Sequence, residues 1–419
     1  MGGTNDAADG TYALRAVDPL IGELLAGLPA LLLVGPRAVG KTTTAHRFAR
    51  SELRLDYPPT AQAVAVDPDA VLRELDEPVL IDEWQVAPAV LGAVKRAVDQ
   101  APHPGRFLVT GSVRGDLDSP TWPGTGRLVR VNMYGLTVAE LLGRAPREPF
   151  LDRVAAQGVE HLPTPLERPD LRGYVELALR SGFPEAALEL PADLRERWLD
   201  SYLDQLLTRD LAMIGGQRDP DRVRRYLEAL ALHTAGVVEH QAVFRAADLS
   251  RATADAYDHL LRNLLVAEAV PAWHSSRLKR LVRTPKRYLI EPALVASVLR
   301  LDTNSILQDA LLLGRLLDTF VMAQLRAELP LCRSRPRLFH LRQADGRREI
   351  DLIAELSGRR TVAIEVKAGA PGTGDARHLA WLRDELGDEF VGGVILHTGQ
   401  LAYSLGDRLT AAPISTLWA

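Results

Sequence analysis

The sequence predicts an α/β protein of three parts: a parallel-sheet domain at the N-terminus, a helical middle, and a smaller α/β domain at the C-terminus. Short apolar runs alternate with helical stretches up to about residue 143, and residues 171–300 are mostly of helical pattern. After residue 302 strand-like and helical segments alternate again. With 419 residues, 47% hydrophobic and 25% charged, the chain is long enough for two or three folded domains.

Composition and charge exclude several classes of protein. A formal net charge of −4 excludes a uniformly basic nucleic-acid coat protein but leaves room for a local basic patch. A single cysteine, Cys332, excludes a disulfide scaffold and a cysteine-based zinc site. No apolar run approaches the ~18 to 20 residues that span a membrane, and residues 1–10 lack the pattern of a secretory signal. We therefore expect a soluble, cytoplasmic protein with no membrane partner.

Three apolar runs in the first part are typical of buried parallel strands. They cover residues 30–34, 78–81 and 106–110, and each is followed by glycine or an acidic residue. Residues 41–50 and 88–100 have helical spacing. Buried strands that alternate with helices predict a doubly wound parallel sheet.

The strongest motif lies where the first strand meets the first helix. Residues 35–42 fit G-x-x-x-x-G-K-[ST] at every fixed position, after a buried strand and at the start of a helix. Its glycines let backbone N–H groups surround phosphates, and the helix N-terminus favours their negative charge. We expect Lys41 to reach the β- and γ-phosphates of ATP, and the Thr42 hydroxyl to bind Mg²⁺. The candidate nucleotide contacts in this loop are Gly35, Pro36, Arg37, Ala38, Val39, Gly40, Lys41, Thr42 and Thr43.

Acidic and hydroxyl residues follow the other two apolar runs. Asp82 is expected to hold Mg²⁺ through water, and Glu83 to orient or activate the attacking water. Thr110 or Ser112, at the end of the third run, is expected to sense the γ-phosphate or position water, or else to be an ordinary turn hydroxyl.

These segments resemble the AAA-type ATPases, and more closely a bacterial and archaeal family with an AAA-type domain followed by a C-terminal domain of unknown function. The matching segments are residues 35–42, 79–83, 110–112, 126–127, 134–140, 181–185, 202–211 and 284–288. The chain departs from the family at Glu291, where aspartate is expected, and at Asp318, where glutamate is expected. The resemblance implies a homo-oligomer in which an arginine of one subunit reaches the neighbour's γ-phosphate. Our candidate is Arg127, with Arg106 and Arg114 as alternatives.

The middle of the chain carries a local positive charge. Residues 144–170, rich in Pro, Arg and Glu, suit a linker, and residues 222–273 resemble a winged helix-turn-helix whose third helix has Ser250 as its N-cap. Between residues 219 and 300 there are 13 basic and 9 acidic residues, a net charge of +4. Arg251, Thr253, Arg262 and the basic segment 277–287 are therefore candidates for DNA contacts. The alternative is a winged helix that serves protein packing.

The C-terminal part carries a second candidate site. Asp351 and the pair Glu365 and Lys367 lie on two adjacent predicted strands, residues 349–355 and 361–367. Two carboxylates and an amine in this arrangement can bind Mg²⁺ or Mn²⁺ and stabilise charge during phosphodiester cleavage. Residues 310–400 resemble the PD-(D/E)xK nucleases, with Asp318 as a further acid on the preceding helix. An ordinary charged hairpin and an inactive nuclease fold remain as alternatives.

Lysine is scarce in this chain, so each lysine is informative. It occurs only at Lys41, Lys95, Lys279, Lys286 and Lys367.

We therefore predict an AAA-type P-loop ATPase domain over residues 1–150, a helical linker region over 151–218, a winged-helix domain over 219–300 and a restriction-endonuclease-like domain over 301–419. The expected function is an ATP-hydrolysing, DNA-binding protein with metal-dependent nuclease potential. The alternative is an ATP-gated regulatory switch or scaffold, in signalling, toxin–antitoxin or defence systems, with an inactive nuclease-like domain.

Overall fold

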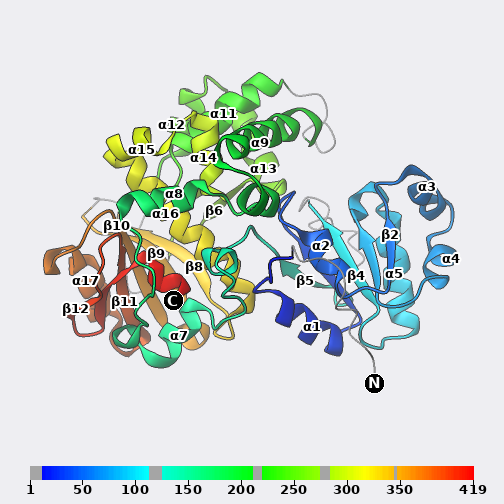
Figure 1. Ribbon diagram of the computed structural model, residues 1–419, viewed down its shortest axis with the longest axis horizontal. Helices are drawn as coiled ribbons and strands as arrows, with labels where there is room; N and C mark the ends of the chain where they lie inside the picture. Colours follow the sequence, from blue (N-terminus) through cyan, green and yellow to red (C-terminus); the bar gives the residue numbers. More distant parts are fainter. Residues whose placement is uncertain (1–11, 113–124, 211–218, 274–283, 344–346) are drawn as a thin grey trace.

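The computed structural model describes residues 12–112, 125–210, 219–273, 284–343 and 347–419. Figure 1 shows the N-terminal sheet and its helices as one lobe, and the middle helices together with the C-terminal sheet as the other. Within the described ranges, no helix is long and apolar enough to cross a membrane.

The N-terminal sheet is parallel throughout, as predicted, with strand order β2-β3-β4-β1-β5. Its strands are β1 (Ala30–Val34), β2 (Ser51–Arg54), β3 (Val79–Asp82), β4 (Phe107–Gly111) and β5 (Val129–Asn132). Every residue of β1, β3 and β4 is buried, which explains their continuous apolar runs. Because all strands run the same way, the segments that follow β1, β3 and β4 meet at one edge of the sheet.

Helices cover both faces of this sheet. They are α1 (Asp18–Gly27), α2 (Lys41–His46), α3 (Pro58–Val66), α4 (Pro68–Arg73), α5 (Ala89–Gln100) and α6 (Val138–Leu141). Helix α5 buries Val90, Val94 and Val98, spaced one helical turn apart, in the core on one face. Helix α1 buries Ile21 and Leu25 in the core on the other face.

Residues 144–170, which we expected to be a linker, instead contain a packed helix, α7 (Phe150–Gln157). Phe150, Leu151 and Val154 are buried in the core below the C-terminal sheet. Arg153 donates hydrogen bonds to the carbonyl oxygens of Ala419 at 2.8 Å and Thr416 at 3.1 Å. The segment is polar on average, but its apolar residues lie on one helix face, and average composition does not reveal this.

The middle of the chain is helical, as predicted. Its helices are α8 (Leu171–Leu179), α9 (Ala192–Gln205), α11 (Pro220–Leu232), α12 (His240–Ala246), α13 (Arg251–Asn263), α14 (Pro292–Leu299) and α15 (Thr303–Gln308), with π-helical turns at Glu185–Glu189 and Leu206–Asp210. Strands β6 (Ala267–Val270) and β7 (Lys286–Leu289) pair antiparallel after α13. The Ser250 side chain accepts a hydrogen bond from the N–H of Thr253, which confirms the predicted N-cap of α13.

A six-stranded mixed sheet, ordered β12-β13-β11-β10-β9-β8, forms the C-terminal part. Its strands are β8 (Arg337–Arg342), β9 (Glu349–Glu355), β10 (Thr361–Lys367), β11 (Phe390–His397), β12 (Tyr403–Gly406) and β13 (Leu409–Pro413), and its helices are α16 (Ala310–Glu328) and α17 (Arg377–Leu386). Short 3₁₀ turns cover Trp84–Val86, Val159–His161, Leu329–Leu331, Ser357–Arg359, Thr373–Ala376, Gly387–Glu389 and Ile414–Trp418. Strand β10 is antiparallel to β9 and parallel to β11, so β9, β10 and β11 are adjacent.

The middle and the C-terminal part share one hydrophobic core. Trp418, at the end of the chain, contacts Tyr174 of α8 and Phe320 of α16, in each case edge to face with ring centroids 6.1 Å apart. Helix α16 therefore lies between the middle helices and the C-terminal sheet, as Figure 1 shows.

Candidate functional site

The phosphate-binding loop connects β1 to α2 at the carboxyl edge of the parallel sheet. Ala38 and Gly40 have positive φ angles of 60° and 86°, which turn the loop sharply before the helix. A Cβ atom at Gly35 would lie 1.9 Å from the carbonyl oxygen of Met133, so glycine is required there. The buried Arg15 braces the loop, because it donates to the Val39 carbonyl at 2.8 Å and pairs with Glu140 at 2.9 Å. Sequence analysis missed Arg15, whose partners are far away in the chain.

Lys41 lies buried inside this loop. Its ammonium donates a hydrogen bond to the carbonyl oxygen of Pro36 at 2.7 Å. Burial lowers the pKa of Lys41 to about 8, although the nearby carboxylates of Glu83 and Asp82 oppose this shift. The ammonium is therefore poorly neutralised in the loop, and a bound anion would stabilise its charge.

Asp82 and Thr42, which we each expected to bind Mg²⁺, are in contact. The Thr42 hydroxyl donates to Oδ1 of Asp82 at 2.7 Å, and the Thr110 hydroxyl donates to the same oxygen. Thr110 also accepts the backbone N–H of Glu83 at 3.2 Å. Thr110 therefore holds Asp82 and Glu83 in place at the end of β3. A hydroxyl and a carboxylate are the hard oxygen donors that Mg²⁺ prefers, so this pair fits the ion.

Glu83 and Ser112 also lie together. The buried Ser112 hydroxyl donates to Oε2 of Glu83 at 3.3 Å. Gln85, which sequence analysis missed, donates to both residues. Gln85 falls two positions after Glu83 in a 3₁₀ turn, and its sequence context carried no signal for this contact.

A pocket of about 710 Å³ opens beside the loop. The loop, helix α2 with Lys41, and Glu83 after β3 form one wall. The opposite wall comes from the middle of the chain, at Pro184, Glu185 and Leu188. The pocket therefore lies between the two lobes.

Arg127 lies outside this pocket. It precedes β5, whereas the phosphate-binding loop follows β1, and the two strands are parallel, so Arg127 is at the opposite edge of the sheet. Its guanidinium pairs with Asp99 at 2.8 Å and its side chain is 41% exposed. A role toward a neighbouring subunit stays a prediction, as it does for Arg106, which is bonded to Glu77. Arg114 lies outside the described residues.

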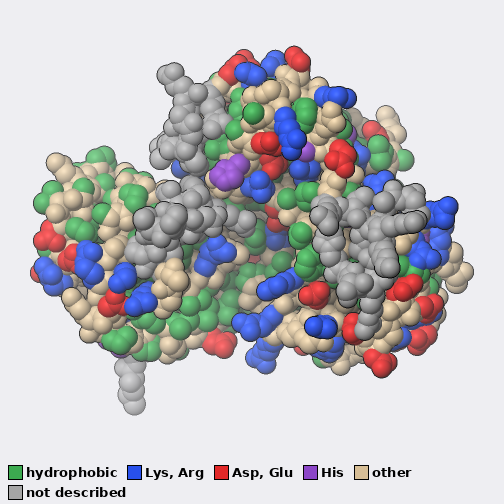
Figure 2. Space-filling view, turned by 180° about the vertical axis from the view of Figure 1, so that it is seen from behind, with side chains coloured by type: hydrophobic (Ala, Val, Ile, Leu, Met, Phe, Trp, Pro, Cys, Tyr) green, Lys and Arg blue, Asp and Glu red, His purple; other side chains and the backbone are tan. Residues whose placement is uncertain are grey.

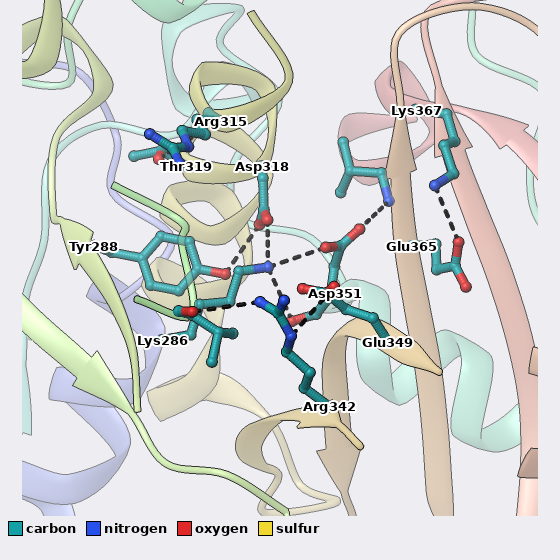
Figure 3. Close-up of polar contacts among 12 residues, drawn as sticks. Lys286, Tyr288, Arg315, Asp318, Thr319, Arg342, Glu349, Asp351, Glu365 and Lys367 are labelled. Carbon is teal, nitrogen blue, oxygen red and sulfur yellow. Dashed lines mark hydrogen bonds and ion pairs between the residues drawn. The ribbon is translucent and has the colours of Figure 1, made fainter. Parts of the chain in front are cut away.

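The C-terminal acidic residues surround an unexpected cation (Figure 3). Lys286 of β7 places its ammonium 2.5 Å from Oδ2 of Asp318 and 3.1 Å from Oδ1 of Asp351. Tyr288 donates to the other oxygen of Asp318 at 3.0 Å. The N–H of Val366 donates to Oδ2 of Asp351, also at 3.0 Å, so both oxygens of Asp351 have partners.

The charged forms of Lys286 and Asp351 stabilise each other. Burial alone would lower the pKa of Lys286, but Asp318 and Asp351 hold it well above its ordinary value. Burial would likewise raise the pKa of Asp351, but Lys286 and the N–H of Val366 hold it below its ordinary value. Lys286, which is buried, and Asp351, which is partly buried, therefore form an ion pair that stays charged at neutral pH.

Glu365 and Lys367 lie on β10, beside Asp351, but they face each other. Their charged groups are 3.3 Å apart. Among the described residues, the buried Oε1 of Glu365 has no hydrogen-bond partner, and Nδ1 of His378 lies 3.8 Å from it. Burial raises the pKa of Glu365 to about 7, with Lys367 opposing the shift. In the part of the chain that the structure describes, no group of three or more His, Cys, Asp or Glu side chains is placed to hold a metal ion. The site that we expected from Asp351 and Glu365 has only two carboxylates, and metal binding there stays a prediction.

For Lys286 and Arg287, the structure corrects our assignment of the basic segment 277–287 to a DNA surface. Lys286 is 2% exposed within the acidic centre. Arg287 lies 3.6 Å from Asp258 and donates to the Val238 carbonyl, with 12% of its side chain exposed. The physical reason is charge pairing, because acidic residues distant in the sequence neutralise both cations. Residues 277–283 lie outside the described residues.

Comparison with known proteins gives a class for the first lobe. Residues 28–142 match a family model described as an AAA domain. Residues 171–305 and 313–417 match two models described as domains of unknown function, DUF8612 and DUF4143.

Similar proteins extend over most of the chain. It is 28% identical over 390 residues to the uncharacterized protein Rv2008c of Mycobacterium tuberculosis and equally to Mb2031c of Mycobacterium bovis, covering 92% of this chain and 80% of each relative. Among solved structures, the Walker-type ATPase PABY2304 of Pyrococcus abyssi resembles 71% of this chain and 99% of its own, at 15% identity and a TM-score of 0.43.

The family match and the geometry agree. A parallel sheet carries a phosphate-binding loop after β1 and paired acidic residues after β3, and both lie within residues 28–142. Residues 28–142 of the first lobe thus match an AAA domain and carry the features of a P-loop nucleotide site, which supports binding and hydrolysis of a nucleoside triphosphate. The nuclease resemblance of residues 310–400 stays a prediction.

Proposed function

We propose that this protein is an ATP-gated switch that binds and hydrolyses ATP with Mg²⁺ in its first lobe and transmits the nucleotide state to its second lobe. The observation that carries the first half is the meeting of Lys41, Thr42, Asp82 and Glu83 at one edge of the sheet. The proposed transmission to the second lobe rests on the pocket, because residues from the middle of the chain form one of its walls.

Each residue has a role in this reaction. Mg²⁺, when bound with ATP, neutralises phosphate charge and polarises the γ-phosphoryl group. Thr42 and Asp82 would hold the ion, while Lys41 exchanges its bond to the Pro36 carbonyl for one to phosphate oxygens. Glu83 orients the attacking water and accepts its proton.

The junction between the lobes is polar and buried, which suits transmission. The N–H of Leu136 donates to the carbonyl of Gly182 at 2.6 Å, next to the pocket wall at Pro184. The N–H of Gly182 in turn donates to Glu291 at 3.0 Å. Movement of the wall on nucleotide binding would therefore displace Glu291 and the helix that follows it.

A second contact across the junction leads to the acidic centre. Gln324 of α16 accepts the N–H of Val138 at 2.8 Å. The same helix carries Asp318, so the first lobe and the acidic centre share one rigid element.

For the C-terminal part we propose an inactive nuclease-like fold that binds a partner. The specific observation is that Lys286 occupies the space between Asp318 and Asp351, where a divalent cation would otherwise bind. The order of α16, β8, β9, β10, α17 and β11 supports the nuclease-like fold.

Nucleic acid remains the partner that we propose for the middle. The three helices α11 to α13, followed by paired β6 and β7, support a winged-helix arrangement. Arg251, at the start of α13, keeps 82% of its side chain exposed. On the face in Figure 2, however, basic and acidic side chains are interspersed, so this contact would be local rather than a broad basic surface.

Two measurements test the switch. We expect ATP turnover to be slow, with ATP retained, and to change little when duplex or single-stranded DNA is added. We also expect no cleavage of supercoiled DNA with Mg²⁺ or Mn²⁺, with or without ATP. Turnover strongly stimulated by DNA, together with cleavage that is lost in Glu365→Ala and Lys367→Ala, would replace the switch with a DNA-processing enzyme.

A further inference from the structure

Beside the nucleotide pocket, two donors hold the carboxylate of Glu83. Nε2 of Gln85 donates to Oε2 of Glu83, and the Ser112 hydroxyl donates to the same oxygen at 3.3 Å. Nε2 of Gln85 also donates to Oγ of Ser112 at 3.2 Å. The three side chains thus form a closed ring at the end of β3 and β4.

The backbone around this ring is shaped to admit Gln85. Glu83 has a positive φ of 56°, which starts the 3₁₀ turn that carries Trp84 and Gln85 back over β4. A Cβ atom at Gly111 would lie 2.2 Å from Nε1 of Trp84 and 3.2 Å from Oε1 of Gln85. Glycine at this position of β4 is what lets the turn lie against the strand.

The placement of Gln85 has an energetic cost. Its Oε1 is buried and has no hydrogen-bond partner among the described residues. A buried amide whose NH₂ group is hydrogen-bonded but whose oxygen is not loses its hydration without full compensation. Reversing the amide would set its oxygen against the Glu83 carboxylate, so the observed orientation follows from that contact. Packing alone does not explain an amide here, since an apolar side chain of similar length would avoid the cost.

We propose that Gln85 is a positioning residue for ATP hydrolysis. With Ser112 it fixes Oε2 of Glu83, so that the other carboxylate oxygen is directed to the attacking water. A base must lie within hydrogen-bond reach of the proton that it accepts, and a freely rotating carboxylate spends little time there. This inference rests on the proposed ATPase function and assigns Ser112 a role through Glu83 rather than through the phosphate.

The test compares Gln85→Met with wild type under saturating Mg·ATP. Methionine keeps the length of the side chain but removes the donor. We expect kcat to fall about tenfold or more, while the Kd for ATP stays unchanged, because the lost interaction serves the chemical step. Gln100→Met, at the exposed end of α5, is the matched control and should behave as wild type.

Repeating the Gln85→Met comparison in a Glu83→Ala protein separates a positioning role of Gln85 from a structural role. If Gln85 acts through Glu83, Gln85→Met should lower kcat no further in a Glu83→Ala protein. Ser112→Ala breaks the same ring and should reproduce the split between kcat and Kd, should Gln85→Met fail to fold. An unchanged kcat in folded Gln85→Met, or a further loss in the Glu83→Ala background, would overturn the inference. Wild-type protein that hydrolyses no ATP would overturn the proposed function as well.

Discussion

The ammonium of Lys286 and the carboxylate of Asp318 form an ion pair 2.5 Å long that is almost fully buried. Lys286 lies on β7, which pairs with the strand after α13, whereas Asp318 lies on α16 below the C-terminal sheet. This pair and the second contact to Asp351 join the middle of the chain to its C-terminal part through charge as well as through the apolar core.

We expect Lys286→Met to lower the free energy of unfolding by ~3 to 5 kcal/mol, because it leaves the buried Asp318 and the partly buried Asp351 without a cation. Denaturant unfolding measures this change. The matched control is Lys95→Met, since Lys95 pairs with Asp99 on an exposed helix face and should cost no more than about 0.5 kcal/mol. Equal stability of Lys286→Met and wild type would contradict the buried pair.

The pKa of Lys41 predicts how ATP affinity depends on pH. Burial lowers this pKa to about 8 in the nucleotide-free protein. Below pH 8 the ammonium is already charged, whereas above pH 8 ATP must bind together with a proton. The Kd for ATP should therefore rise by up to about tenfold per pH unit above pH 8. Calorimetric titrations at pH 7, 8 and 9 measure this slope, and Lys41→Met should abolish it along with tight binding.

Glu291 predicts a pH dependence of stability. Burial raises its pKa from 4.5 to about 7, opposed by the N–H groups of Gly182 and Ala293. Between these two values the folded protein keeps a proton that the unfolded chain has released. The free energy of unfolding should therefore fall by ~3 kcal/mol as pH rises from 4.5 to above 7.

Comparison of Glu291→Gln with wild type isolates this contribution. The variant should lack that part of the pH dependence, while Glu196→Gln, at an exposed position of α9, should retain it. Identical unfolding curves for wild type and Glu291→Gln at both pH 5 and pH 8 would rule out a proton on Glu291.

Gly35→Ala should damage the nucleotide site directly. Its Cβ would fall 1.9 Å from the Met133 carbonyl, so the loop or β5 must shift. We expect loss of ATP binding and a destabilisation of about 1 to 3 kcal/mol. Gly27→Ala is the control, because a Cβ there has nothing within 4 Å. Full ATP affinity in Gly35→Ala would show that the loop does not need this close approach.

The strands of the first lobe show what local sequence can predict. Strands β1, β3 and β4 are buried on both faces and so appear as continuous apolar runs. Strands β2 and β5 lie at the sheet edges, and each buries a single residue, Leu53 and Val131. Neither edge strand has a continuous apolar run, and the apolar–polar alternation of β5 covers only four residues, so neither strand was predicted.

The phosphate-binding loop and the acidic centre around Lys286 also differ in how well local sequence predicts them. The residues of the phosphate-binding loop are contiguous, so their spacing alone marked the loop as a candidate site, and the contacts of Lys41 and Thr42 with ATP and Mg²⁺ stay predictions. Lys286 finds its partners 32 and 65 residues away, and its neighbours in sequence are basic, so it was assigned to a surface. The scarcity of lysine was the available signal, since arginine serves as the ordinary cation of this chain.

Phosphate release from Mg·ATP by wild type, Lys41→Ala and Glu83→Gln, with ATP binding measured in parallel, tests directly whether the first lobe hydrolyses ATP. We predict full hydrolysis by wild type alone, slow residual hydrolysis with ATP binding retained in Glu83→Gln, and loss of both hydrolysis and binding in Lys41→Ala. Lys95→Ala, a lysine far from the pocket, should match wild type. Turnover and ATP affinity that are unchanged in Lys41→Ala would contradict the assignment of this loop as the nucleotide site.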